Sequence, residues 1–330
     1  MRRRQALAGL LACAAGAYGQ AAAPRWSLGY LGPSAETAPK LLAAFREGLA
    51  AYGYEEGRNL VVHWRWTNAG VRMNDDATLT ASAREFVNAR VDVIVASIDP
   101  AIVAARRAAA GTVPIVMLNA SDPVGLGFVA SLAHPGGNVT GLTNQSVDLI
   151  GKKVQMLLEV APATRTIGML VSGPGVLRDE AIARARTFAA SRGIGLVVAE
   201  ATSAPALDAA FAELKRGRAD ALFVADTGGG VFFTERRRLV ELANLHRLPA
   251  MFSNAEVVEA GGLMAYAPNS VDNYRRAAMY IDRILHGARP GDLPVELPAK
   301  FELTINATTA KALGITFPPS LLLQVDRTVE

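Results

Sequence analysis

The chain has little of what marks several common classes of protein. Its one cysteine, Cys13, rules out a disulfide within the chain. It has no Gly-x-Ser-x-Gly elbow and no Gly-x-Gly-x-x-Gly turn after the first predicted strand, and its four histidines have no evident nucleophile partner. His134 has no His or Cys neighbour at the spacing of a metal site. We therefore predict no catalytic residues, no metal site and no cofactor.

Net charge and long apolar runs are also scarce. The chain has 34 basic and 30 acidic residues, and without Arg2, Arg3 and Arg4 the counts are 31 and 30. A near-neutral chain gives no electrostatic argument for binding nucleic acid, and no helix-turn-helix precedes Trp26. No segment reaches the ~18 apolar residues that a transmembrane helix needs.

The N-terminus has the pattern of an export signal. A basic start is followed by an apolar run over 6–17 and then by small residues, so we predict a signal peptide over 1–23 and a periplasmic or extracytoplasmic protein. The segment 3–7 partly fits a twin-arginine signal, but Arg2 stands where Ser or Thr is usual, which leaves the export route open. Cys13 resembles a lipoprotein processing site, but a twelve-residue leader would be short, and we favour a small residue within the apolar run.

Two neighbouring βα units dominate the first half of the chain. The apolar runs Val91–Ala96 and Pro114–Leu118 do not alternate with polar residues, which is typical of parallel strands covered on both faces. Pro100 suits the first position of the helix that follows, and Asp99 is placed to cap its amides. In an open α/β sheet such strand ends face the crevice where ligands bind, so we expect the binding site there.

The same alternation continues to the C-terminus and predicts an α/β fold with two similar lobes, for which 330 residues are enough. Trp64 and Trp66 have two interpretations, stacking on a ligand or ordinary packing. The other strands are expected at 26–31, 60–66, 166–171, 195–199, 221–225 and 249–252, and the helices at 39–52, 75–89, 149–160, 179–192, 204–216, 232–246, 271–286 and 307–313.

Four segments resemble one protein family, the ABC transporter substrate-binding proteins often described as tryptophan/tyrosine transport components. They cover 48–60, 122–141, 258–269 and 301–321, and the Asp-Pro-Val-Gly run that begins at Asp122 is the most specific part. The likeness extends from about Trp26 to Glu330. Two departures are visible, because Ala267 stands where Gly is common and Thr67–Gly70 replaces a more acidic turn.

The resemblance implies a type I periplasmic-binding-protein fold, with two doubly wound α/β lobes joined by three crossover strands. By that likeness the chain crosses between lobes near Thr143, Ala267 and Pro298. The domains expected from it are an N-terminal lobe of 24–143 plus 268–297 and a C-terminal lobe of 144–267 plus 298–330.

The resemblance also implies a function. The chain would be the solute-binding protein of an ABC importer, a monomer that works with a permease and an ATPase and makes or breaks no bond. Its lobes would close by a hinge on a small solute with a carboxylate, such as an amino acid, including an aromatic one. The alternatives are a ligand-binding partner of a membrane sensor and, with less support, a secreted hydrolase.

The candidate ligand contacts follow from the strand-end loops. We expect the amides around Pro100 and Ala101, with Ser97, to hold the carboxylate, because a helix N-terminus favours an anion. Asp226 with Thr227 would bind an ammonium group from the other lobe.

Other strand-end residues complete the expected site. Tyr266 would cover an apolar side chain of the ligand, or lie in the hinge instead. Asp99 and Asp122 have a second interpretation as caps, and Asp226 as a support of its own loop. The remaining predicted contacts are Ser34, Thr37, Asn119, Ser121, Asp122, Thr143, Ser172 and Glu256.

Overall fold

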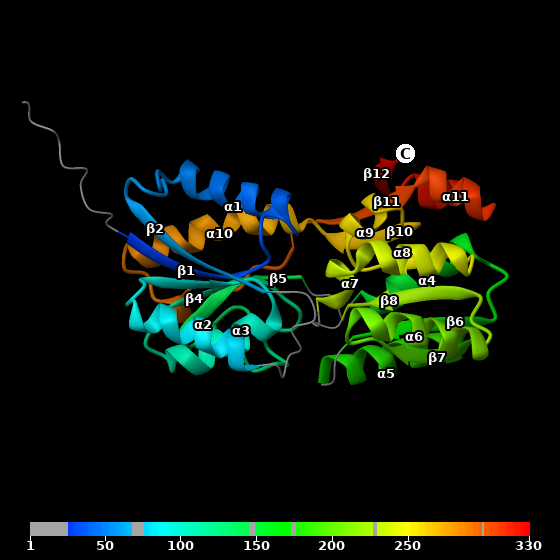
Figure 1. Cartoon of the computed structure of the whole chain (residues 1–330), viewed down its shortest axis with the longest axis horizontal. Coiled ribbons are helices and arrows are strands. Elements are labelled where there is room, and N and C mark those ends of the chain that lie inside the picture. Colours follow the sequence, from blue (N-terminus) through cyan, green and yellow to red (C-terminus); the bar gives the residue numbers. More distant parts are fainter. Residues whose placement is uncertain (1–25, 68–75, 145–148, 173–175, 227–229, 299) are drawn as a thin grey trace, which may run out of the picture.

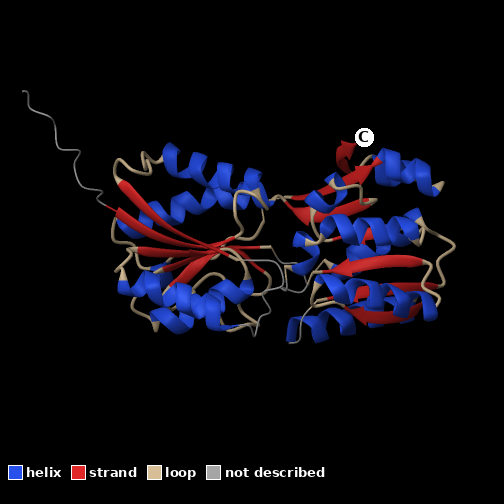
Figure 2. Cartoon of the chain, viewed as in Figure 1, coloured by secondary structure: helices blue, strands red, loops and turns tan. Residues whose placement is uncertain are grey.

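The computed structural model describes residues 26–67, 76–144, 149–172, 176–226, 230–298 and 300–330. The predicted signal peptide, with Cys13, lies outside the described residues. Two β-sheets lie side by side along the long axis, and each has helices on both faces (Figures 1 and 2). We call the sheet that holds the first strand, with its helices, the N-terminal lobe, and the other the C-terminal lobe.

The N-terminal lobe is built on a five-stranded sheet of order β2-β1-β3-β4-β5, in which every pairing is parallel. Its strands are β1 (Trp26–Gly32), β2 (Leu60–Trp66), β3 (Val93–Ala96), β4 (Ile115–Ala120) and β5 (Val139–Thr143), and its helices are α1 (Pro39–Ala51), α2 (Asp76–Asn88), α3 (Asp99–Ala109) and α10 (Ser270–Leu285).

The C-terminal lobe is built on a seven-stranded sheet of order β12-β11-β10-β9-β8-β6-β7, parallel except where β10 meets β11. Its strands are β6 (Thr166–Val171), β7 (Gly195–Glu200), β8 (Ala221–Ala225), β9 (Ala250–Phe252), β10 (Met264–Pro268), β11 (Phe301–Asn306) and β12 (Val325–Val329). Its helices are α4 (Ile150–Val160), α5 (Val176–Ser191), α6 (Ala204–Arg216), α7 (Val231–Thr234), α8 (Arg236–Leu245), α9 (Ala255–Glu259), α11 (Ala307–Leu313) and α12 (Pro319–Leu322).

The chain passes between the sheets three times. It leaves the N-terminal sheet after β5, returns after β10 to form α10, and leaves again after the short 3₁₀ helix η1 (Pro290–Asp292) to form β11. The mixed α/β fold of two lobes is therefore as predicted, whereas the residue bounds of the domains stay a prediction.

Each sheet is covered on both faces, which explains the unbroken apolar runs in the sequence. In β3 all four residues are buried, and they alternate between two cores. Val93 and Val95 pack with α1 and α10, whereas Ile94 and Ala96 pack with α2 and α3. A parallel strand with helices on both sides has no solvent face, so nothing selects polar residues within it.

Contact between α1 and α10 joins segments that are far apart in the sequence (Figure 1). Gly48 of α1 permits it, because a β-carbon there would lie 2.2 Å from the backbone oxygen of Arg275. Asn273 of α10 is buried, and its Nδ2 lies 2.8 Å from Asn119 Oδ1 and 3.2 Å from the Leu118 oxygen. α10 is therefore anchored to the end of β4.

Several elements differ from the sequence prediction. The helix expected over 232–246 is two helices, α7 and α8, because Glu235 leaves the helical conformation (φ −91°, ψ 21°) and Arg236 Nη1 donates to the Phe233 oxygen. Elements that the sequence analysis did not predict are β5, α9, β10, η1, β11, α12 and β12.

We expect Gly48→Ala to destabilise the protein by roughly 1–3 kcal/mol, because the methyl group would force α1 away from α10. The free energy of unfolding in urea measures this. Gly151→Ala in α4 is the matched control, since its β-carbon would meet a Phe188 ring carbon at 3.5 Å, an ordinary contact. That change should be neutral or stabilising by up to ~1 kcal/mol. Equal stability of Gly48→Ala and the parent would contradict the close packing.

Candidate functional site

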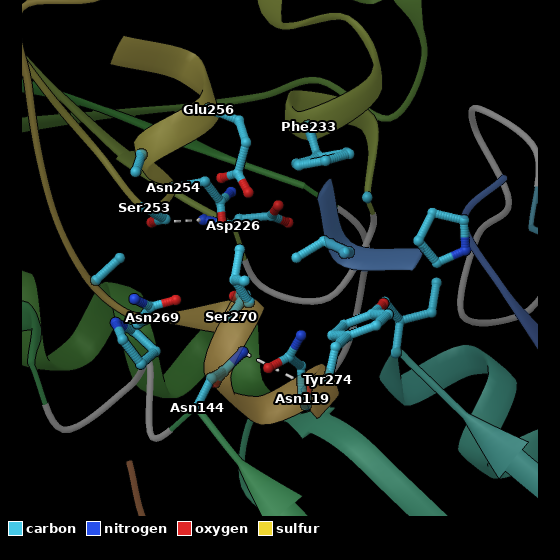
Figure 3. A pocket seen from close by; sticks show the side chains of 18 of the residues that line it. Asn119, Asn144, Asp226, Phe233, Ser253, Asn254, Glu256, Asn269, Ser270 and Tyr274 are labelled. Carbon is cyan, nitrogen blue, oxygen red and sulfur yellow. Dashed lines mark hydrogen bonds between the residues drawn. The ribbon is translucent and has the colours of Figure 1, made fainter. Parts of the chain in front are cut away.

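A cavity of about 450 Å³ lies between the two lobes. The N-terminal lobe contributes residues such as Thr37, Asp99 and Tyr274, and the C-terminal lobe contributes residues such as Asp226 and Phe233. This volume falls within the range of pockets for small ligands. Figure 3 shows residues of the two lobes facing each other across it.

The parallel βα geometry brings helix N-termini to the cavity. α1, α3, α7, α9 and α10 each begin at or beside residues that line it. The amides of a first helical turn have no acceptor within the helix and carry partial positive charge. The walls thus combine polar loop side chains with amide groups that favour an anion.

Asp99 does not play its predicted role. It is the first residue of α3, whose N-cap position is Ile98, and no side chain caps that helix. Instead, Asp99 Oδ1 accepts a hydrogen bond of 3.0 Å from the Ser121 amide. Burial raises the pKa of Asp99 to about 6, against the lowering effect of Ser121, and the charges of Asp226 and Asp122 raise it further.

The N-terminus of α3 is therefore not open to the solute as predicted. Ile98 and Asp99 form the wall there, and Pro100 and Ala101 are buried outside the lining. Ser97 is fully buried behind the wall.

Asp226 lines the cavity at the end of β8, on the C-terminal lobe. Its Oδ1 lies 3.5 Å from the hydroxyl of buried Ser172, and its amide nitrogen lies 3.4 Å from Ser253 Oγ. Ser253 also donates to the Val224 oxygen at 2.9 Å, which ties β9 to β8. Ser172 therefore lies beside the carboxylate, and Ser253 holds the backbone of Asp226 (Figure 3).

Two more charged residues line the cavity from the C-terminal lobe. Lys153 of α4 is 2% exposed. Burial lowers its pKa to about 8, while the charge of Asp226 raises it. Glu256, at the start of α9, also has a raised pKa because of burial.

One ion-pair cluster at the cavity bridges the lobes. Glu259 of α9 accepts Lys40 of α1 at 2.8 Å and Arg327 of β12 at 2.7 Å. These contacts and those of neighbouring charges lower the pKa of Glu259 in spite of partial burial, which raises it. The two cations are thus already paired with a carboxylate of the protein.

Aromatic rings line the cavity, although they are not the ones predicted. Phe233 of α7 and Tyr274 of α10 do so (Figure 3), and burial raises the pKa of Tyr274 to about 12, so its hydroxyl stays neutral. Tyr266 lies against Phe301 instead, with ring centroids 5.9 Å apart. Trp64 and Trp66 stack on each other at 5.3 Å outside the lining, which supports the packing interpretation.

The structure brings together some of the residues predicted for the site. Those that line the cavity are Thr37, Asn119, Ser121, Asp226 and Glu256. Those outside the lining are Ser34, Ser97, Pro100, Ala101, Asp122, Thr143, Ser172 and Tyr266. Thr227 lies outside the described residues.

Local hydrogen bonds explain why several of the predicted residues lie outside the lining. Ser34 Oγ lies 3.3 Å from Thr37 Oγ1 within a turn, and Asp122 Oδ1 accepts from the Gly125 amide at 2.8 Å. Thr143 donates to the Ala120 oxygen at 2.6 Å. The cap interpretation of Asp122 therefore fits the structure.

Sequence reasoning missed lining residues that come from segments interpreted as plain helix or loop. Lys153 is one of them, and its residue type does not distinguish it from the preceding Lys152. The others that add polar or aromatic groups are Lys40, Thr67, Asn144, Phe233, Thr234, Ser253, Asn254, Glu259, Asn269, Ser270, Tyr274, Glu302 and Arg327.

Within the described residues, no helix is long and apolar enough to cross a membrane. The same part of the chain has no cluster of three His, Cys, Asp or Glu side chains that could hold a metal ion.

Known proteins resemble the chain over most of its length. A "Tyrosine-binding protein" of Clostridioides difficile is 27% identical over 284 residues, which cover 86% of this chain and 78% of that protein. A conserved domain protein of Vibrio cholerae has a crystal structure with a TM-score of 0.82 at 27% identity, covering 92% of this chain and 99% of that one.

A third similarity is to the crystal structure of an ABC domain from Streptococcus pneumoniae in complex with L-Trp. Its TM-score is 0.77 at 23% identity, and the match covers 92% of this chain and all (100%) of that one. This likeness concerns the fold. The family model described as "ABC transporter substrate binding protein" matches residues 35–329. The chain therefore belongs to the family of ABC transporter substrate-binding proteins.

Proposed function

We propose that this protein is the extracytoplasmic solute-binding protein of an ABC importer. It would bind an amino acid, with an aromatic side chain as the best candidate, and deliver it to a permease driven by an ATPase. The observation that carries the proposal is the cavity of about 450 Å³ whose walls come from both lobes. The names of the relatives support an aromatic amino acid, since one is called a tyrosine-binding protein and another was solved with L-Trp.

The chemistry of the walls suits such a solute. Asp226 and Asp99 offer carboxyl oxygens to an ammonium group, and Phe233 and Tyr274 offer ring surface to an apolar side chain. First-turn amides of the helices that begin at the cavity favour a carboxylate. A micromolar affinity would need only about −8 kcal/mol in total.

The same arrangement supports the proposal that the lobes close on the solute. A solute that contacts both lobes binds a closed form better than an open one and so shifts the population toward it. The pair between Lys40 and Glu259 joins α1 to α9 across the cavity. Lys40 is mostly exposed, so this pair alone contributes little to closure.

We expect Asp226→Asn to weaken the binding of L-tyrosine or L-tryptophan by roughly 10–100-fold, the loss typical of a hydrogen bond to a charged group. Isothermal titration calorimetry measures this. Asp122→Asn is the matched control and should bind as the parent does, because Asp122 lies outside the lining and Asn keeps the oxygen that accepts from Gly125. If both variants bind as the parent does, Asp226 is not a ligand contact.

We expect the bound amino acid to reduce the radius of gyration of the protein in small-angle X-ray scattering. The physical reason is that the solute bridges walls that belong to separate lobes. An amino acid that raises the melting temperature but leaves the radius of gyration unchanged would contradict hinge closure. If no amino acid or small organic acid raises the melting temperature, the proposed solute class is wrong.

We expect Asp99 to make the empty protein less stable as pH rises. Its pKa in the folded state is about 6, above the ordinary 3.8, so the folded state binds more protons between these values and stability falls as pH rises through them. The loss is on the order of 3 kcal/mol. Between pH 4 and 7, the free energy of unfolding of Asp99→Asn in urea should not show this fall. The control Glu213→Gln, which changes an exposed residue, should still show it. A parallel pH dependence of Asp99→Asn and the parent would contradict the assignment.

A further inference from the structure

Lys153 is an unusual residue to find in the wall of the cavity. It belongs to α4 in the C-terminal lobe, is 2% exposed and lines the cavity. Its neighbours Val154 and Leu157 are buried in the core beneath that helix. The long side chain thus runs through packed surroundings, and its amine reaches the cavity.

The amine of Lys153 is not paired within the described part of the chain. It forms no hydrogen bond and no ion pair there. The charge of Asp226 acts on it without direct contact. The other two cations of the described lining, Lys40 and Arg327, both pair with Glu259. Lys153 is therefore the cation of the described lining whose charge is available to a solute.

A buried ammonium group without a counter-ion destabilises a folded protein. Burial lowers the pKa of Lys153 to about 8, with Asp226 acting in the opposite direction, so most of the amine is still protonated at neutral pH. Residues that reduce the stability of the folded protein and face a cavity are typical of binding sites. A carboxylate inside the cavity would supply the missing counter-ion.

We infer that Lys153 binds the carboxylate of the solute and, with Asp226 on the ammonium group, selects molecules that carry both charges. This rests on the proposed function and deepens it, because it names the residues that would recognise the two charges of the amino acid. It also replaces the amides around Pro100 as the principal carboxylate site. Both charged groups belong to the C-terminal lobe, so the head of the amino acid binds there, and the N-terminal lobe closes over it.

Calorimetric titration with matched ligands tests the assignment. L-tyrosine and L-tryptophan carry the carboxylate, and tyramine and tryptamine are the same molecules without it. We expect Lys153→Met to weaken binding of the amino acids at least ~30-fold, as loss of one partner of a buried charge pair does, and to leave binding of the amines within about 2-fold. Lys152→Met is the matched control and should bind as the parent does. Lys152 is next in the chain, and its Nζ lies 3.5 Å from Gln324 Oε1.

Thermal unfolding without ligand gives a second readout. Met is close to Lys in length and removes the buried charge, so Lys153→Met should raise the melting temperature of the protein without ligand by at least ~2 °C and reduce the further rise caused by a fixed concentration of the amino acid. A lysine that serves the fold would give the opposite result, a lower melting temperature.

Each result has a defined meaning. Three results would overturn the role of Lys153 while the proposed function stands. In the first, Lys153→Met loses affinity for amino acids and amines equally, and in the second it loses affinity for neither. In the third, the variant without ligand melts at a lower temperature than the parent. If the parent binds none of the amino acids, the proposed function fails and the role of Lys153 fails with it.

Discussion

The packing of α10 against the N-terminal lobe is the constraint on which the cleft depends. This helix follows the second crossing, which returns the chain from the C-terminal sheet, and it lies against α1, where Gly48 lets the two backbones approach. Asn273 ties it to the end of β4, and its first turn lies at the cavity. Because α10 is held to one lobe and connected to the other, the segment around Asn269 links the two walls of the site.

Parallel strand order then determines what kind of surface lines the cleft. Except for β11 and β12, which run in the opposite direction, the strands of each sheet end at the edge that faces the other lobe, and the helices that follow begin there. Such an edge presents polar loops and amides, whereas the apolar residues of the strands are enclosed between helix layers. One architecture thus separates stability, which resides in the cores, from recognition, which resides in the loops.

The charged residues of the wall reduce the stability of the empty protein. Asp99 and Lys153 are both buried, and burial moves their pKa values toward the neutral forms. A polar wall without its solute is a typical case in which function opposes stability. Asp226 is different, since Ser172 and Ser253 hold it in place at the rim.

Sequence alone determined the α/β class, the bounds of most strands and helices, and the edge of each sheet where a site would lie. Local patterns were enough because runs such as 221–225 and 204–216 depend on residues close in the chain, and both match their elements. The split of α7 from α8 escaped prediction, because the bond from Arg236 to Phe233 leaves no periodic signal.

Only the tertiary structure decided which polar residues face the cavity. Asp122 and Asp226 both follow strands and look alike in the sequence, yet Asp122 caps a turn and Asp226 lines the cleft. Lys153 could not be distinguished from Lys152 by type or by immediate neighbours. The physical reason is that exposure to a cleft between two lobes is a property of surfaces that come from segments far apart in the chain, and the sequence near one residue does not encode what lies opposite it.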